Sequence, residues 1–221
     1  MLALTLLVAA TAAACPQNLV SDVETPASAK QLLTVEAKVA RTTYATLRTW
    51  RRAGSCWVAV AGPYSARLGK NGLSSNRREG DGTTPTGVFR IGPTIYGNEP
   101  NPGVKLRYRK LRCGDWWDED SSSPTYNTFQ HVRCGVDPPF GAASEGLWQQ
   151  PKAYPFLAVV EYNTHPVVPG RGSGIFLHAQ TGGPTIGCVS LRKEQLRDVL
   201  RWLRPGAAPM IAIGTSAQLR S

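Results

Sequence analysis

A histidine and a cysteine flank a glycine-rich turn in residues 173–192, and this arrangement constrains the fold more than any other stretch. The apolar run at residues 175–177 predicts a buried strand that ends at His178. The Thr-Gly-Gly-Pro sequence that follows is a turn signal. Because the chain reverses there, we expect Cys188 to return beside the histidine.

Cys188 and His178 are interpreted as a nucleophile and its general base. A thiol reacts as the thiolate, and a cysteine with a pKa of ~8.5 is only about 3% ionised at pH 7. We expect the histidine and nearby amides to lower that pKa to ~6.5, a change of about 2.7 kcal/mol. Gly187 leaves the sulfur open to approach, and its backbone belongs to the expected oxyanion region. The alternative is a structural cysteine with a histidine that only satisfies a loop.

These residues resemble the active-site signature of the L,D-transpeptidase (YkuD-type) family, in which a histidine and a spacer precede Ser/Thr-x-Gly-Cys-x-Arg. Residues 80–91 resemble the family's Asp-Gly-x-Thr-Pro strand entry, and residues 166–173 resemble the loop before its histidine strand. The resemblance covers most of residues 33–214 and is nearest to a secreted actinobacterial branch. Ile186 and Ser190 depart from the motif, which usually has histidine and arginine at these positions.

The resemblance implies a peptidoglycan enzyme in which Cys188 is acylated by a stem tetrapeptide and an amine acceptor then resolves the thioester. Water as acceptor would make the protein an L,D-carboxypeptidase, and the sequence does not select between the two. The departures at Ile186 and Ser190 leave open a catalytically weak or inactive wall-binding module. An amidase-type endopeptidase is disfavoured, because such enzymes place cysteine before histidine. No nucleotide, flavin or metal motif is present, so no cofactor is expected.

Residues 97–146 are long, irregular and aromatic, and such loops are usually functional or disordered. Our hypothesis is that they form one wall of the active-site cleft; the alternative is a flap that fills the edge of the fold. The candidate substrate contacts are Trp117, Tyr126, Asn127, Asn163, Thr185 and Arg192. A backbone carbonyl near Thr185 or the Asn163 side chain is expected to orient the imidazole. His131 is expected to be structural.

The chain carries 25 Lys and Arg against 15 Asp and Glu, a net charge of +10. Such a surface favours polyanions. The charges are dispersed and no nucleic-acid motif is present, so the expected partner is an anionic cell wall rather than nucleic acid. The turn-rich residues 69–84 contain Arg77, Arg78 and Glu79, which are expected to face solvent; a place beside the substrate groove is the alternative.

Residues 1–14 are apolar, uncharged and too few to span a bilayer, which is typical of an export signal. Residues 15–30 are expected to be a flexible tether, residues 31–214 one catalytic domain and residues 215–221 a loose tail. These features predict a secreted or cell-envelope monomer. Membrane attachment is expected only if Cys15 carries a lipid.

Among the other cysteines, Cys113 and Cys134 bracket one coherent loop and are the predicted disulfide, which would stabilise the fold by roughly 3 kcal/mol. Cys56 is expected to be a buried free thiol. No Cys-x-x-Cys is present and the three histidines lack ligand spacing, so no metal site is expected.

The fold class is expected to be mainly β with few helices, as a β-sandwich or partly closed barrel. Alternating apolar residues predict an opening hairpin within residues 31–51, and further strands are expected at residues 154–162 and 209–213. One helix is predicted from a Ser190 cap to Leu203, because its apolar residues recur at helical spacing.

Overall fold

The computed structural model describes residues 15–141 and 143–220. The export signal expected at residues 1–14 lies outside the described residues. The rest of the fold is mainly β, as predicted, with one α-helix, α1 (Lys193–Trp202), in the described chain.

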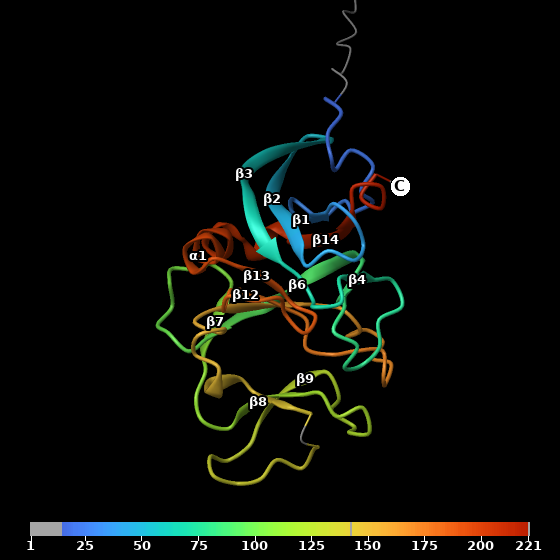
Figure 1. Ribbon diagram of the computed structural model, residues 1–221. Helices are drawn as coiled ribbons and strands as arrows, with labels where there is room; N and C mark the ends of the chain where they lie inside the picture. The colour runs from blue at the N-terminus through green and yellow to red at the C-terminus, as the bar shows by residue number, and fades with distance from the viewer. Residues whose placement is uncertain (1–14, 142, 221) are drawn as a thin grey trace, which may run out of the picture.

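Most strands of the described residues belong to one mixed sheet (Figure 1). Its strands are β1 (Gln31–Ala37), β2 (Tyr44–Ala53), β3 (Cys56–Arg67), β6 (Gly87–Gly97), β7 (Arg107–Lys110), β11 (Leu157–Val160), β12 (Phe176–Ala179), β13 (Val189–Leu191) and β14 (Met210–Thr215). The short elements are β4 (Leu73–Ser74), β5 (Thr84–Pro85), β8 (Asp115–Asp118), β9 (Thr128–His131), β10 (Glu145–Gly146), η1 (Leu147–Gln149) and η2 (Pro205–Ala207).

The main sheet curls back on itself. Its strand order is β11-β12-β13-β3-β2-β1-β14-β6-β7, and β6 also pairs with β11 at the other end of that order. This pairing joins Leu157 to Tyr96 and Val160 to Ile91. The result is the partly closed barrel of the predicted fold class, opened by the predicted antiparallel β1–β2 hairpin.

Helix α1 packs the side chains of Leu196, Val199 and Leu200 into the main core. It begins at Lys193, so the predicted cap at Ser190 is wrong. Ser190 lies in β13, where it pairs with His178 of β12, and this pairing keeps the chain extended until Arg192. The helix ends at Trp202, shortly before Pro205, which lacks the N–H that a helix needs.

The segment expected to be a flexible tether is packed against the sheet instead. Leu19 and Val20 are buried in a second apolar cluster with Trp50 and Trp57, and this burial holds the segment in place. Leu219 joins the same cluster, so the C-terminal residues are not a loose tail either. In Figure 1 the blue N-terminal segment and the C-terminus lie at the same end of the molecule.

Cys56 is not a free thiol, because it forms a disulfide with Cys15. A sulfur held in that bond has no valence left for a lipid, so lipid attachment at Cys15 is inconsistent with the structure. The predicted Cys113–Cys134 disulfide is confirmed. No helix in the described ranges is long and apolar enough to cross a bilayer.

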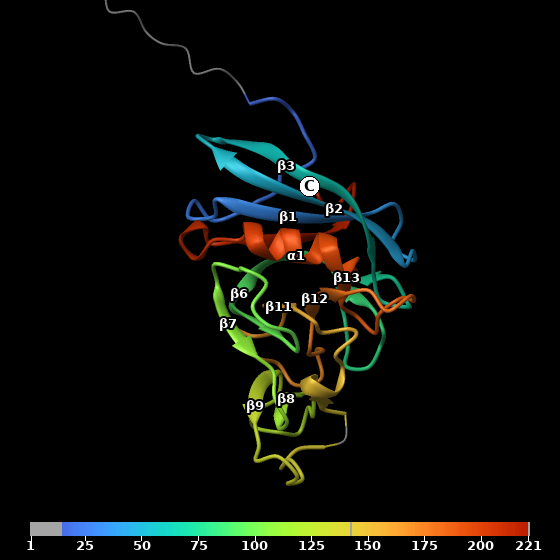
Figure 2. The same cartoon turned by 90° about the vertical axis from the view of Figure 1, so that its left-hand side faces the viewer.

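Residues 97–146 are more ordered than the sequence suggested. They contain β7 and the three-stranded sheet β10-β8-β9, which the Cys113–Cys134 disulfide braces. Figure 2 shows this small sheet at the end of the molecule opposite the N-terminal segment. The sheet packs onto the barrel through Trp117, whose ring meets that of Phe176 edge to face at 5.1 Å.

Candidate active site

Cys188 and His178 line one cleft of about 630 Å³. Thr185 and Gly187 line it as well, as the sequence suggested. The other lining residues come from several parts of the chain, and they are Arg77, Glu79, Gly80, Glu119, Ala143, Ser144, Glu145, Tyr154, Ser173, Gly174, Thr181, Pro184 and Ile186. The structure therefore brings the thiol and the imidazole to the same solvent-accessible space.

The pairing of β12 with β13 explains where the sulfur lies. The two strands run parallel, with Leu177 opposite Val189. Cys188 therefore enters the sheet beside Phe176, whose N–H donates to Cys188 Sγ at 3.3 Å. The thiol itself donates to the Gly174 carbonyl oxygen at 3.2 Å. The sulfur is thus fixed by backbone groups on one side and faces the cleft on the other.

His178 is 7% exposed, and its Nδ1 lies 2.9 Å from the Ala179 carbonyl oxygen. A carbonyl only accepts, so Nδ1 carries the proton and Nε2 is left as the basic nitrogen. The expectation that Asn163 or a carbonyl near Thr185 orients the ring is therefore wrong. The Tyr154 ring packs edge-on against the imidazole at 5.4 Å.

Burial sets the protonation of both groups. It lowers the pKa of His178 to about 4, although the Ala179 and Ala153 carbonyls oppose the change. Burial also raises the pKa of Cys188 to about 12; the Phe176 N–H opposes this rise, and the Glu145 and Glu119 carboxylates add to it. The expectation of a thiol pKa near 6.5 is wrong, because removal from water disfavours the charged form. In the free protein the pair is a neutral thiol and a neutral imidazole.

Gly187 is required for a reason different from the one expected. Its φ is +154°, and a Cβ there would lie 2.4 Å from Arg77 Nη1, so a side chain would collide with the guanidinium. The Gly187 N–H donates to Thr185 Oγ1 at 3.1 Å, and that hydroxyl donates to the Cys188 carbonyl at 2.7 Å. Thr185 therefore shapes the turn that delivers Cys188.

Carboxylates line the wall that residues 97–146 contribute. Glu119 and Glu145 face the cleft, and Glu145 accepts a hydrogen bond from the Tyr154 hydroxyl at 2.8 Å. Burial, together with the charges of Glu145 and Glu79, raises the pKa of Glu119 to about 8. Sequence reasoning expected aromatic contacts here and missed both acids, which stand in turn-rich stretches with no pattern to distinguish them from solvated residues.

Three of the expected substrate contacts are buried behind that wall instead. Trp117, Tyr126 and Asn127 are each 5% exposed or less, and none of them lines the cleft. Asn127 Oδ1 accepts from the Trp117 indole and from the Gly174 N–H, both at 3.0 Å. The Tyr126 hydroxyl donates to Glu79. These side chains hold the backbone around the cleft, so the prediction that they contact substrate directly is wrong.

Two other expected contacts also lie outside the cleft lining. The Asn163 amide donates to the carbonyls of Val168 and Gly172, which closes the loop before β12. Arg192 is exposed at the start of α1. The guanidinium that lines the cleft belongs to Arg77 instead, in the loop expected to face solvent.

His131 is a structural residue, as predicted, because its Nδ1 lies 2.7 Å from the buried Asp115 carboxylate. Among the described residues, no group of three or more His, Cys, Asp or Glu is arranged to hold a metal ion.

The fold and the cleft define a class: a small β-barrel-like domain that presents one free thiol and one imidazole in a peptide-sized groove. The model of the YkuD family, the L,D-transpeptidase catalytic domain, matches residues 34–211. The chain belongs to this family. No curated protein matches the chain. The family's general activity is L,D-transpeptidation of peptidoglycan, and the two disulfides indicate an extracytoplasmic location.

Proposed function

We propose that this domain is a peptidoglycan L,D-transpeptidase in which Cys188 is the nucleophile and His178 the general base. The observation that carries the proposal is the shared cleft: the free thiol and an imidazole with its Nδ1 proton fixed border the same space. A volume of about 630 Å³ is in the usual range for ligand sites.

In the first step the sulfur attacks the carbonyl carbon of the peptide bond that precedes the terminal D-alanine of a stem tetrapeptide. Nε2 of His178 takes the thiol proton as the C–S bond forms. The tetrahedral intermediate collapses, the C–N bond breaks, and the imidazolium returns the proton to the departing D-alanine nitrogen. A thioester on Cys188 remains. The Cys188 backbone amide is the proposed donor to the oxyanion, and such a donor typically contributes ~3 kcal/mol.

In the second step an acceptor amine attacks the thioester. Its proton passes to His178 and from there to the leaving sulfur, so the new amide is formed and the thiol is restored. The proposed acceptor is the side-chain amine of a neighbouring stem peptide, which gives a cross-link. Water in the same place gives L,D-carboxypeptidase activity.

The setting of the protein fits this substrate. The chain has a net charge of +10 and therefore attracts an anionic wall. Both disulfides require an oxidising compartment to form and persist. We propose that the protein is secreted and acts as a monomer in the cell envelope.

The test is to incubate the purified protein with a stem tetrapeptide and analyse it by intact-protein mass spectrometry. We expect Cys188 to gain the tripeptide acyl group while one D-alanine is released per protein. Cys188→Ser is the matched control and should show no thioester. Adding an amine acceptor should then release the acyl group as a new amide. Release as the free acid alone would identify a carboxypeptidase, and the absence of any adduct would refute acyl transfer.

A further inference from the structure

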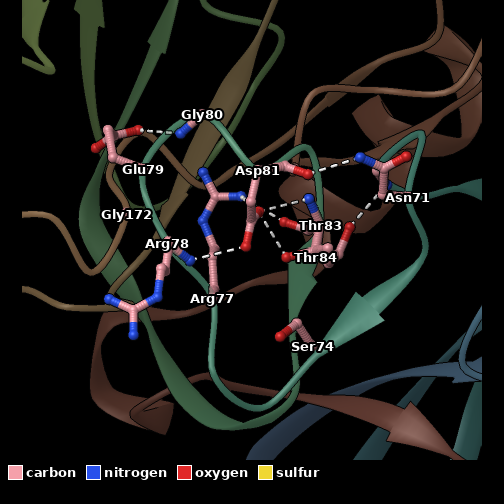
Figure 3. Close-up of polar contacts among 12 residues, drawn as sticks. Asn71, Ser74, Arg77, Arg78, Glu79, Gly80, Asp81, Thr83, Thr84 and Gly172 are labelled. Atoms are coloured by element: carbon pink, nitrogen blue, oxygen red, sulfur yellow. Dashed lines mark hydrogen bonds and ion pairs between the residues drawn. The ribbon is translucent and has the colours of Figure 1, made fainter.

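Arg77 is a cation buried beside the proposed nucleophile. It lies in the loop between β4 and β5 and is 4% exposed, although its neighbour Arg78 is exposed. Figure 3 shows its guanidinium turned towards Asp81, with the Arg78 side chain pointing away. Burial of a charged side chain is costly, so a site that retains one usually uses its charge or its donors.

The guanidinium lies close to the backbone of two glycines that are far apart from it in the sequence. A Cβ at Gly187 would lie 2.4 Å from Arg77 Nη1, and a Cβ at Gly172 would lie 2.4 Å from its Nε. Only glycine at both positions allows this approach. Arg77 therefore touches the turn that delivers Cys188 and the segment that leads to the Gly174 carbonyl, which accepts a hydrogen bond from the Cys188 thiol.

The donors of Arg77 join its own loop to the segment before β12. Nη1 donates to the Thr83 carbonyl, and Nη2 donates to the Ser173 carbonyl at 3.4 Å. Its ion pair is with Asp81, at 3.6 Å. The Asp81 carboxylate also accepts from the backbone N–H groups of Arg78 and Thr83, both at 2.8 Å (Figure 3). Because Asp81 is shared with these donors and lies 3.6 Å from the guanidinium, it neutralises the charge of Arg77 only in part.

We propose that Arg77 is a positioning residue for acyl transfer: its guanidinium fixes the backbone on both sides of Cys188, and its charge favours the thiolate over the thiol. The inference builds on the proposed role of Cys188. It gives the loop between β4 and β5 a function in the reaction.

The other titratable groups around the sulfur are either carboxyl groups, whose negative charge disfavours the thiolate, or uncharged. They are Glu119 and Glu145 on the small-sheet wall, Glu79 on the same loop as Arg77, Tyr154 before β11 and His178 on β12. The two wall carboxylates raise the pKa of Cys188 and Arg77 lowers it. Among the described residues Arg77 is the only basic side chain that lines the cleft, apart from the neutral His178.

The test is the pH dependence of Cys188 alkylation by iodoacetamide, which measures ionisation of the thiol and needs no peptide. Among residues 15–141 and 143–220 Cys188 is the only free cysteine, so the label reports one site. The variants are Arg77→Gln, Arg77→Lys and the matched control Arg78→Gln, which removes the same charge from the exposed neighbouring position. Far-UV circular dichroism establishes that each variant is folded.

We expect Arg77→Gln to move the alkylation profile about one pH unit upward, which corresponds to a roughly tenfold slower reaction at any fixed pH below the thiol pKa. Arg77→Lys keeps the charge and should move it less, whereas Arg78→Gln should leave it in place. If Arg77 only fills space, Gln and Lys will behave alike and the profile will not move, which overturns the proposal. If Arg77→Gln does not fold, Asp81→Asn is the test instead. This variant removes the carboxylate that partly neutralises the guanidinium, so the alkylation profile should move to lower pH. An unchanged profile would refute the proposed role of Arg77.

The two proposals fail separately. If no acyl adduct forms but the alkylation profile follows the charge of Arg77, the transpeptidase proposal falls, whereas the effect of Arg77 on ionisation of the Cys188 thiol stands. If the adduct forms and the alkylation profile does not depend on Arg77, the transpeptidase proposal stands and the proposal for Arg77 falls.

Discussion

Replacing Asn127 by alanine tests whether this residue supports the cleft or contacts substrate. Its side chain makes four hydrogen bonds while only 3% exposed: it accepts from Trp117 Nε1 and Gly174 N, and it donates to two carbonyls. Those carbonyls belong to Tyr162, at 3.1 Å, and Asn163, at 2.7 Å. Its φ of +59° is a conformation that asparagine tolerates better than alanine does.

The size of the effect follows from these contacts. Asn127→Ala leaves two buried N–H groups and two partly buried carbonyls without this partner, each at a cost of about 1 kcal/mol. The left-handed backbone adds about 1 kcal/mol. We therefore expect the free energy of unfolding to fall by about 5 kcal/mol, a large part of the 5–15 kcal/mol typical of a domain.

Urea unfolding with both disulfides intact, followed by tryptophan fluorescence, measures this loss. The matched control is Asn76→Ala at an exposed position, which should change stability by less than about 0.5 kcal/mol. If Asn127→Ala costs no more than the control but raises KM for the stem peptide, Asn127 is a substrate contact and our interpretation of the wall is refuted.

Two further results are expected. Because burial holds the His178 pKa at about 4 against 6.5 in the unfolded chain, only the unfolded state takes up this proton as pH falls from 6.5 to 4. Unfolding free energy should therefore drop by about 3 kcal/mol over that range, a slope that His178→Gln should lack in urea titrations. The Cys15→Ser/Cys56→Ser pair opens a link spanning 41 residues and should cost about 4 kcal/mol; an unchanged urea midpoint would show that apolar packing alone holds the N-terminal segment.

Short-range patterns were the part of the fold that the sequence could predict. Alternation in residues 31–51 identified the opening hairpin, and the two cysteines that bracket one loop identified the Cys113–Cys134 disulfide. The Cys15–Cys56 disulfide could not be found in this way. Its formation depends on Leu19 and Val20 burying themselves against Trp50 and Trp57, and a lone apolar pair in an aperiodic segment does not indicate its partner.

The same distinction between local and long-range sequence information applies to the candidate site. His178 lies on β12, Cys188 immediately precedes the neighbouring strand β13, and a recognisable turn joins the two, so local sequence was enough to bring them together. The burial of Arg77 depends on Gly172 and Gly187, which lie far away in the sequence, and no local pattern shows that a guanidinium will fill the space above them. The sequence also could not show how deeply Cys188 and His178 are buried, and for that reason the expected direction of the shift in the thiol pKa was wrong.

That error changes how the proposed reaction must proceed. With the Cys188 pKa raised to about 12 and the His178 pKa lowered to about 4, the thiol–imidazole pair lies well below the thiolate–imidazolium pair in free energy. A preformed thiolate is therefore scarce, and the proton has to leave the sulfur while the carbon–sulfur bond forms. Such a coupled transfer depends on where Nε2 points, because a general base acts only within hydrogen-bond reach. The Ala179 carbonyl, which fixes the ring through Nδ1, therefore determines where Nε2 points in the proposed reaction.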